Sequence, residues 1–95
     1  MSKKLIVANC PDYTNFSMPH CYILKSIKSS KYYIGATEDI GERFRRHNAG
    51  LVRSTKSDRP WKLIHVEDFI DFRDARKREF QIKSWKSRAA IEKLI

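Results

Sequence analysis

An arginine and a histidine lie one helical turn apart in a segment that suits phosphate chemistry. Residues 39–48 begin with an aspartate and end just before a glycine, a pattern that predicts a helix. At 3.6 residues per turn, Ile40, Phe44 and His47 share one face of that helix, and Arg43 borders it. A guanidinium there could neutralise a phosphate, and an imidazole could transfer a proton. Each residue taken alone is more simply explained by a structural role.

A glutamate interrupts the apolar face of a second predicted helix, residues 71–86. Glu79 falls near the middle of that face in angle. The apolar members of the face are Phe72, Ala75 and Ile82. Burying an ionised carboxylate without a partner costs several kcal/mol, so Glu79 should have a cation nearby. One Mg²⁺ ion is a candidate, because proteins usually hold it with one or two carboxylates, water and phosphate oxygens. A salt bridge to Arg43 or Lys83 is an equally good explanation.

Two tyrosines lie on neighbouring predicted strands. Residues 22–27 and 32–37 are rich in β-branched and aromatic residues, and the polar residues 28–31 between them predict a hairpin. Tyr22 belongs to the first strand and Tyr33 to the second, while Tyr32 should point to the opposite face. By themselves these tyrosines would be interpreted as core residues.

The remaining segments complete an α+β fold. A basic loop over residues 51–60 leads to a third strand over residues 61–69, and two helices follow over residues 71–86 and 87–95. Asp71 should cap the first of these, and Asp39 with Glu42 resembles a capping box for the earlier helix. The predicted architecture is a three-stranded antiparallel sheet flanked by helices, in the order ββαβαα. We expect one domain over residues 18–95, preceded by a loosely structured, turn-rich N-terminal extension over residues 1–17.

The charge balance favours a polyanionic partner. Lys and Arg number 20 against 11 Asp and Glu, which gives a net charge of +9 over 95 residues. Such a surface attracts nucleic acid, because basic side chains release the counterions condensed on it. There is no C-x-x-C pair and no run of apolar residues long enough to span a membrane. The apolar run at residues 5–8 is too short for a signal peptide, so a cytoplasmic location is expected.

Several of these residues recur at the spacing of a known family. Tyr33-Ile34-Gly35 forms one half-motif, and His20-Cys21-Tyr22 forms the other, keeping the tyrosine but not the usual Gly and Ile. The two tyrosines are eleven residues apart, Arg43 follows Tyr33 by ten and His47 follows it by fourteen. Over residues 20–95 the chain therefore resembles the GIY-YIG nuclease superfamily, and it looks most like the small standalone bacterial members. Further matching positions are Gly50, Thr55, Pro60, Trp61 and Glu79.

The resemblance implies a divalent-metal-dependent endonuclease that hydrolyses nucleic-acid phosphodiesters. It gives catalytic roles to Tyr22, Tyr33, Arg43, His47 and Glu79. Glu79 would hold one Mg²⁺ or Mn²⁺ ion near the leaving oxygen, and Arg43 would neutralise the phosphate. Either Tyr22 or His47 would act as the general base, and the sequence does not decide between them. The asparagine that the family carries at a later position has no match in this sequence.

The basic residues outside this set are candidates for nucleic-acid binding. Arg53, Lys56 and Arg59 lie in the basic loop and should contact the phosphate backbone, which carries little sequence information. Lys83 lies one turn beyond Glu79 and could contact phosphate or interact with Glu79, although a solvated lysine is the simpler explanation. We expect a DNA substrate recognised with low sequence specificity or by its structure, because 95 residues leave little room for a targeting domain. RNA, duplex and branched substrates stay open, as do DNA repair, recombination and phage defence.

Two other function classes compete with this interpretation. The chain could be a basic nucleic-acid-binding module whose catalysis is weak, lost or dependent on a protein partner. A binder would have no need of a glutamate on an inward helix face, and this favours the enzyme. A zinc-bound interaction module would use Cys10, His20, Cys21 and His47, but their spacing matches no common zinc pattern.

Overall fold

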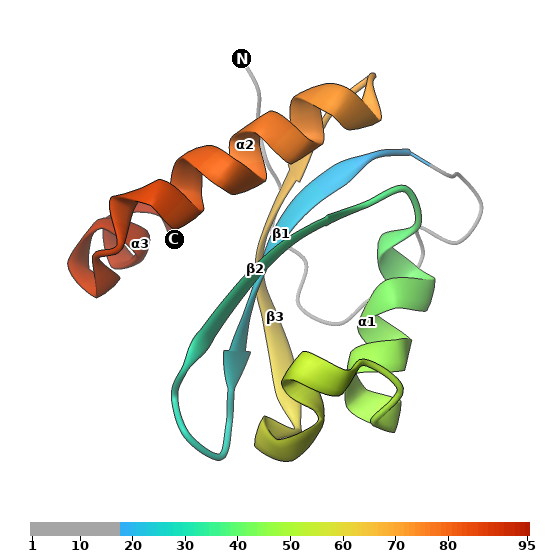
Figure 1. Cartoon of the computed structure of the whole chain (residues 1–95), viewed down its shortest axis with the longest axis vertical. Helices are drawn as coiled ribbons and strands as arrows, with labels where there is room; N and C mark the ends of the chain where they lie inside the picture. Colours follow the sequence, from blue (N-terminus) through green and yellow to red (C-terminus); the bar gives the residue numbers. More distant parts are fainter. Residues whose placement is uncertain (1–17) are drawn as a thin grey trace.

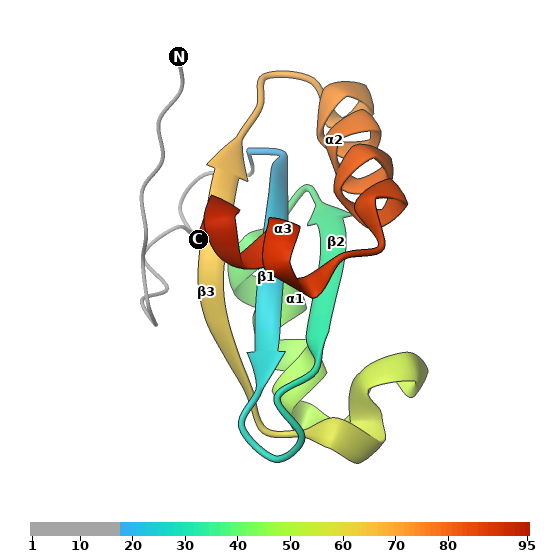
Figure 2. The same ribbon diagram turned by 90° about the vertical axis from the view of Figure 1, so that its left-hand side faces the viewer.

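Helices cover both faces of a small antiparallel sheet (Figures 1 and 2). The computed structural model describes residues 18–95, so the expectation for residues 1–17 lies outside the described residues. The elements are β1 (His20–Ser26), β2 (Tyr32–Thr37), α1 (Ile40–Ala49), the 3₁₀ helix η2 (Arg53–Asp58), β3 (Trp61–Asp68), α2 (Phe72–Trp85) and α3 (Arg88–Leu94). The predicted α+β class and the ββαβαα order are confirmed.

The central strand of the sheet is β1. It pairs antiparallel with β2 on one side and with β3 on the other, which gives the order β2-β1-β3. The predicted hairpin is therefore present, and its register places Tyr22 opposite Gly35 and Leu24 opposite Tyr33. Tyr22 and Tyr33 thus lie on one face of the sheet as diagonal neighbours.

The alternation of side chains along the strands divides the core into two layers. The helix α1 packs against one face, and α2 with α3 packs against the other (Figure 1). The layer beside α1 contains Tyr22, Leu24, Ile40, Trp61, Leu63 and Val66. The layer beside α2 and α3 contains Cys21, Ile23, Ile34, Ile82 and Ile91. Tyr33 packs against the first layer and Tyr32 against the second, as predicted from the strand period.

The helix starts follow the sequence with one correction. The side chain of Asp39 accepts a hydrogen bond from the backbone N–H of Glu42 at 3.1 Å, so the predicted cap of α1 is present. The capping box is incomplete, because the Glu42 carboxylate pairs with Arg45 at 2.9 Å and the N–H of Asp39 donates to Thr37 at 3.1 Å. Asp71 caps α2 as predicted.

No helix within residues 18–95 is long and apolar enough to cross a membrane.

The segment predicted as a loop contains the 3₁₀ helix η2. A helix this short has no hydrophobic period, so the sequence gives no signal for it. Contacts with other elements hold it in place: the hydroxyl of Ser26 donates to the carbonyl of Asp58 at 2.7 Å, and the indole N–H of Trp61 donates to the carbonyl of Thr55 at 2.9 Å. These bonds fix Thr55 beneath α1, where its side chain is fully buried.

Candidate active site

A buried hydrogen bond joins the first tyrosine to the histidine. The hydroxyl of Tyr22 lies 2.9 Å from Nε2 of His47, and both residues are 0% exposed. Tyr22 comes from the central strand β1, and His47 comes from the last turn of α1. The apolar side of α1 packs Ile40 and Phe44 against the same layer, which brings His47 down onto the tyrosine.

The second ring nitrogen of His47 also has a hydrogen-bond partner. Nδ1 of His47 lies 2.8 Å from the hydroxyl of Thr55, and that hydroxyl lies 3.3 Å from the carbonyl of Val52. When the Thr55 proton is directed to Val52, the Thr55 oxygen accepts from Nδ1–H. In that tautomer a neutral His47 has its lone pair on Nε2, where it can accept the Tyr22 proton.

A glycine on the neighbouring strand makes room for the tyrosine. A Cβ atom on Gly35 would lie 2.6 Å from the Tyr22 hydroxyl oxygen, closer than real Cβ contacts. The phenol therefore rests against the bare backbone of Gly35. On the other side, the ring of Tyr33 contacts the edge of His47 with 4.9 Å between centroids, and its centroid lies 6.3 Å from that of Tyr22.

Burial and one cation set the protonation of the pair. Burial raises the pKa of the Tyr22 hydroxyl, Tyr33 raises it further, and the nearby Arg43 opposes both effects. Burial and the Arg43 charge together lower the pKa of His47 to about 4. At neutral pH the tyrosine is consequently a phenol and the histidine a neutral imidazole. The pair is therefore a neutral phenol hydrogen-bonded to a neutral imidazole.

The glutamate of α2 lies near this pair and is held by cations of its own helix. Glu79 is 8% exposed, and its carboxylate contacts Lys83 at 2.7 Å and Arg76 at 3.2 Å. Of the two salt bridges offered as the alternative to a metal ion, the one to Lys83 is present. The negative charge of Glu79 helps to raise the pKa of Tyr22, which places the carboxylate within electrostatic reach of that hydroxyl. Arg43 also acts on Tyr22, so this hydroxyl is bonded to His47 and lies under the electrostatic influence of Arg43 and Glu79.

A lone carboxylate is the metal-binding group available at this point. Within the described part of the chain, no group of three or more His, Cys, Asp and Glu side chains could hold a metal ion. Magnesium typically keeps several waters and takes one or two carboxylates together with substrate phosphates. Glu79 fits that mode of binding once Lys83 and Arg76 turn away, and both cations are about half exposed.

The predicted nucleic-acid-binding residues of the loop point outward. Arg53, Lys56 and Arg59 are exposed, while Thr55 between them is buried against His47. The guanidinium of Arg59 also packs against the backbone of Gly50, which has a left-handed φ of 81°. This segment therefore presents cations to solvent and one hydroxyl to the site.

Two residues acquire roles that the sequence did not reveal. Thr55 is hydrogen-bonded to Nδ1 of His47, and Gly35 leaves space for the Tyr22 ring, whereas both were only motif positions in the sequence. A glycine within a strand is a signal for close approach of another group, so Gly35 could have been found. Thr55 could not, because its contact with His47 depends on the path of η2.

The zinc alternative finds no support among the described residues. Cys21 lies in the layer opposite Tyr22 and His47, and burial raises the pKa of its thiol to about 12. Its neighbour His20 alternates to the other face of β1. Cys10 lies outside the described residues.

Comparison with known proteins decides the family. The model of the GIY-YIG catalytic domain matches residues 18–93. This chain belongs to the GIY-YIG family. Its described residues accordingly form a nuclease-type catalytic domain. No solved structure matches the chain.

The relatives of this GIY-YIG domain include proteins of the UPF0213 group. One from Halobacterium salinarum is 37% identical over 78 residues, which cover 81% of this chain and 99% of the relative. One from Staphylococcus saprophyticus is 39% identical over 77 residues, with 80% and 92% covered. One from Listeria welshimeri is 43% identical over 63 residues, with 65% and 69% covered. Matches of this extent agree with the resemblance to small standalone members.

The contact between Gly35 and Tyr22 predicts the effect of adding one methyl group. Gly35→Ala should displace the phenol from its place and break the bond to His47, with a loss of about 1–3 kcal/mol in the free energy of unfolding. Urea unfolding measures the loss. Gly41→Ala in α1 is the matched control and should be neutral or stabilising, because alanine favours a helix interior. Equal stability of wild type and Gly35→Ala would contradict the close contact.

The low pKa of His47 predicts a specific loss of stability in acid. Its pKa is about 4 in the folded protein and 6.5 for an ordinary histidine, so between these values the unfolded chain binds more protons. The free energy of unfolding should fall as the pH is lowered through this window. We expect wild type to lose up to about 3 kcal/mol more than His47→Gln. Urea unfolding at about pH 7 and pH 4 tests this, and parallel losses in the two proteins would refute a buried neutral histidine.

Proposed function

We propose that this GIY-YIG domain is a divalent-metal-dependent endonuclease that hydrolyses DNA phosphodiesters with low sequence specificity. The observation that carries the proposal is the buried hydrogen bond between Tyr22 and a neutral His47, in a nuclease-type domain and under the influence of Arg43 and Glu79. A phenol bonded to an imidazole acceptor is a proton relay, and hydrolysis needs a group that takes a proton from water.

The relay assigns the two residues different parts in one proton transfer. Tyr22 positions the attacking water and accepts its proton as the phenolic proton moves to Nε2 of His47. The raised pKa of Tyr22 makes a free phenolate unfavourable, so the two transfers are coupled. Thr55 keeps the Nδ1 proton in place, which leaves Nε2 as the acceptor. His47 is therefore the proposed final base, and Tyr33 orients its ring.

The substrate itself would make His47 a better base. Burial and the Arg43 charge keep its pKa near 4 when no phosphate is bound. A phosphodiester paired with Arg43 brings a negative charge that offsets the guanidinium, and the pKa of His47 rises. Arg43 neutralises the phosphate and then the additional charge of the transition state through its planar fork of donors. Proton acceptance is thereby coupled to substrate binding.

Glu79 is the proposed metal ligand. Its carboxylate is paired with Lys83 and Arg76, and a divalent ion and a substrate phosphate would take the places of these two cations. A Mg²⁺ or Mn²⁺ ion bound there would stabilise the charge on the leaving oxygen. Lys83, released from Glu79, is well placed to pair with a substrate phosphate.

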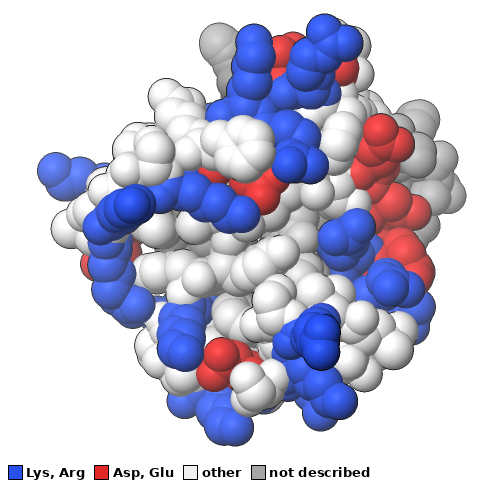
Figure 3. Space-filling view, viewed as in Figure 1, with Lys and Arg blue, Asp and Glu red and all other residues white. Residues whose placement is uncertain are grey.

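The charge distribution supports a substrate held through its backbone. On the face shown in Figure 3, Lys and Arg side chains surround a hollowed and largely uncharged centre. The exposed cations of η2 and the residue after it extend this basic surface. Contacts of this kind fix the register of a duplex or strand but read few bases, so low sequence specificity follows. The proposed residues are Arg53, Lys56, Arg59 and Lys83.

Paired variants test the nuclease directly. Plasmid and branched DNA should be cut with Mg²⁺ or Mn²⁺ and not with EDTA, and Glu79→Gln and Arg43→Ala should each lose about 100-fold or more in rate. The matched controls are Glu92→Gln and Arg45→Ala, since Glu92 pairs with Arg88 at i,i+4 as Glu79 does with Lys83, and Arg45 is an exposed neighbour on α1. Both controls should cut at the wild-type rate.

The same assay distinguishes the enzyme from a simple binder. Cleavage that survives in Glu79→Gln and Arg43→Ala would contradict the proposed mechanism. Salt-dependent DNA binding without cleavage under either metal would favour a nucleic-acid-binding module. Cleavage confined to an RNA substrate would retain the chemistry and correct the substrate.

A further inference from the structure

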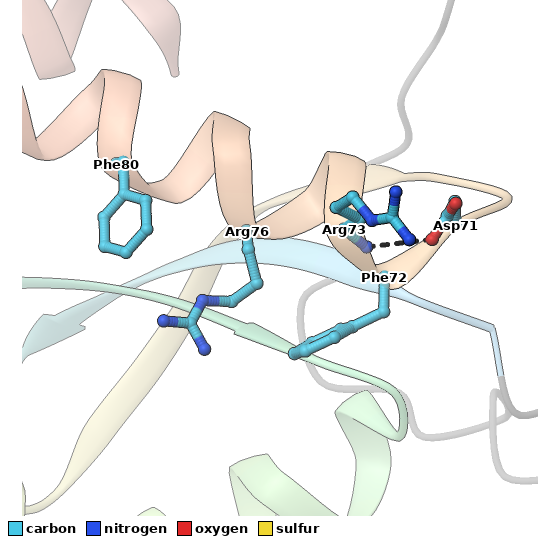
Figure 4. Close-up of a pocket in the computed structure, with 5 residues that line it drawn as sticks. All are labelled: Asp71, Phe72, Arg73, Arg76 and Phe80. Carbon is cyan, nitrogen blue, oxygen red and sulfur yellow. Dashed lines mark hydrogen bonds between the residues drawn. The ribbon is translucent and has the colours of Figure 1, made fainter.

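Two phenylalanines and an arginine form a row on the exposed side of α2. Phe72, Arg76 and Phe80 are four residues apart, so their side chains follow one another along one face of the helix. The guanidinium carbon of Arg76 lies 5.9 Å from the centroid of the Phe72 ring and 5.1 Å from that of Phe80. Figure 4 shows the three side chains extending from the same side of the helix.

The row lies next to the carboxylate of the proposed active site. Arg76 also contacts Glu79 at 3.2 Å, so one guanidinium connects the aromatic row to the metal ligand. The three side chains line an open pocket of about 440 Å³ together with Asp71 and Arg73 (Figure 4). A group bound against Phe80 would therefore lie beside Arg76, which contacts the proposed metal ligand Glu79.

The packing of α2 against the sheet does not explain the exposed aromatic ring of Phe80. The helix α2 buries Ala75 and Ile82 against the sheet, while Phe80 is 55% exposed and lies outside both core layers. Pairs at i,i+4 stabilise a helix by only a few tenths of a kcal/mol, which a smaller side chain would also provide. An exposed aromatic face beside a cation is instead suited to a flat, electron-rich partner.

We propose that Phe80 and Arg76 form a nucleobase-stacking site for an unpaired base adjacent to the cleaved phosphodiester. This inference rests on the proposed function, because it takes the partner from the phosphate chemistry at Arg43 and Glu79. The base stacks on the flat face of the Phe80 ring, and the guanidinium of Arg76 supplies a cation beside that ring. A base within an intact duplex is covered by its neighbours, so the site selects nucleotides that are unpaired or turned out at the cleavage position.

Equilibrium binding to a base-containing and a base-free strand tests the site. The probes are a fluorescein-labelled oligothymidylate and a strand of equal length whose central residues are abasic, titrated in EDTA so that no cleavage occurs. Wild type should bind the thymidylate more tightly, by between about 5- and 150-fold for one stacked base. Phe80→Ala and Phe80→Leu should bind both strands equally, while Phe80→Tyr should keep the preference.

The controls separate stacking from folding and from charge. Ile70→Ala removes a side chain that is 93% exposed and should leave the preference unchanged. Phe80→Leu keeps apolar bulk on the helix, and a native circular dichroism spectrum shows that it folds. Equal affinity of wild type for the two strands, or an unchanged preference in Phe80→Leu, would overturn the proposal.

The outcomes for this site and for the nuclease are distinguishable. A base preference that depends on Phe80, in a protein that cuts no DNA or RNA with either metal, would support the stacking site and refute hydrolysis. Glu79-dependent cleavage with no base preference in wild type would support hydrolysis and refute the stacking site.

Discussion

The hydrogen-bond chain from Tyr22 through His47 to Thr55 is the constraint on which the site depends. It joins three elements: the central strand β1, the end of α1, and η2. Each link is buried, so a partner lost at any point leaves a polar group unpaired at a cost of about 1–3 kcal/mol. Folding and the protonation state of the site are therefore determined by the same bonds. The hydroxyl of Thr55 also lies 3.3 Å from the carbonyl of Val52.

Other features of the fold support this chain. The bare backbone of Gly35 gives space to the Tyr22 ring, and burial together with the Arg43 charge lowers the pKa of His47. On the far side of the sheet, α2 packs Ala75 and Ile82 inward and so carries Glu79 to the β2 edge. The cations paired with Glu79, Arg76 and Lys83, come from its own helix. The helices α1, with Arg43 and His47, and α2, with Glu79, thus pack on opposite faces of the sheet.

The sequence predicted what depends on local pattern. The strand period placed Tyr32 and Tyr33 on opposite faces, and the polar residues 28–31 predicted the hairpin. Glu79 was identified because an ionised carboxylate is unexpected on the apolar face of a helix. The structure shows the cation that its burial requires, which is Lys83. What depends on tertiary packing was missed: η2 has no sequence period, and the contact of Thr55 with His47 exists only because η2 folds beneath α1. The sequence also left open whether Tyr22 or His47 is the general base, because their contact depends on how α1 packs on the sheet.

The tautomer of His47 is the most direct test of the proposed proton relay from Tyr22 to His47. Long-range ¹H–¹⁵N correlation spectra of the histidine rings distinguish the imidazolium and the two neutral forms, and His47→Gln assigns the signals. At neutral pH we expect His47 to be uncharged with its proton on Nδ1 and its lone pair on Nε2, and Thr55→Val should disturb that state. A proton on Nε2 or a charged ring at neutral pH would contradict the central claim, because Tyr22 would then have no acceptor for its proton.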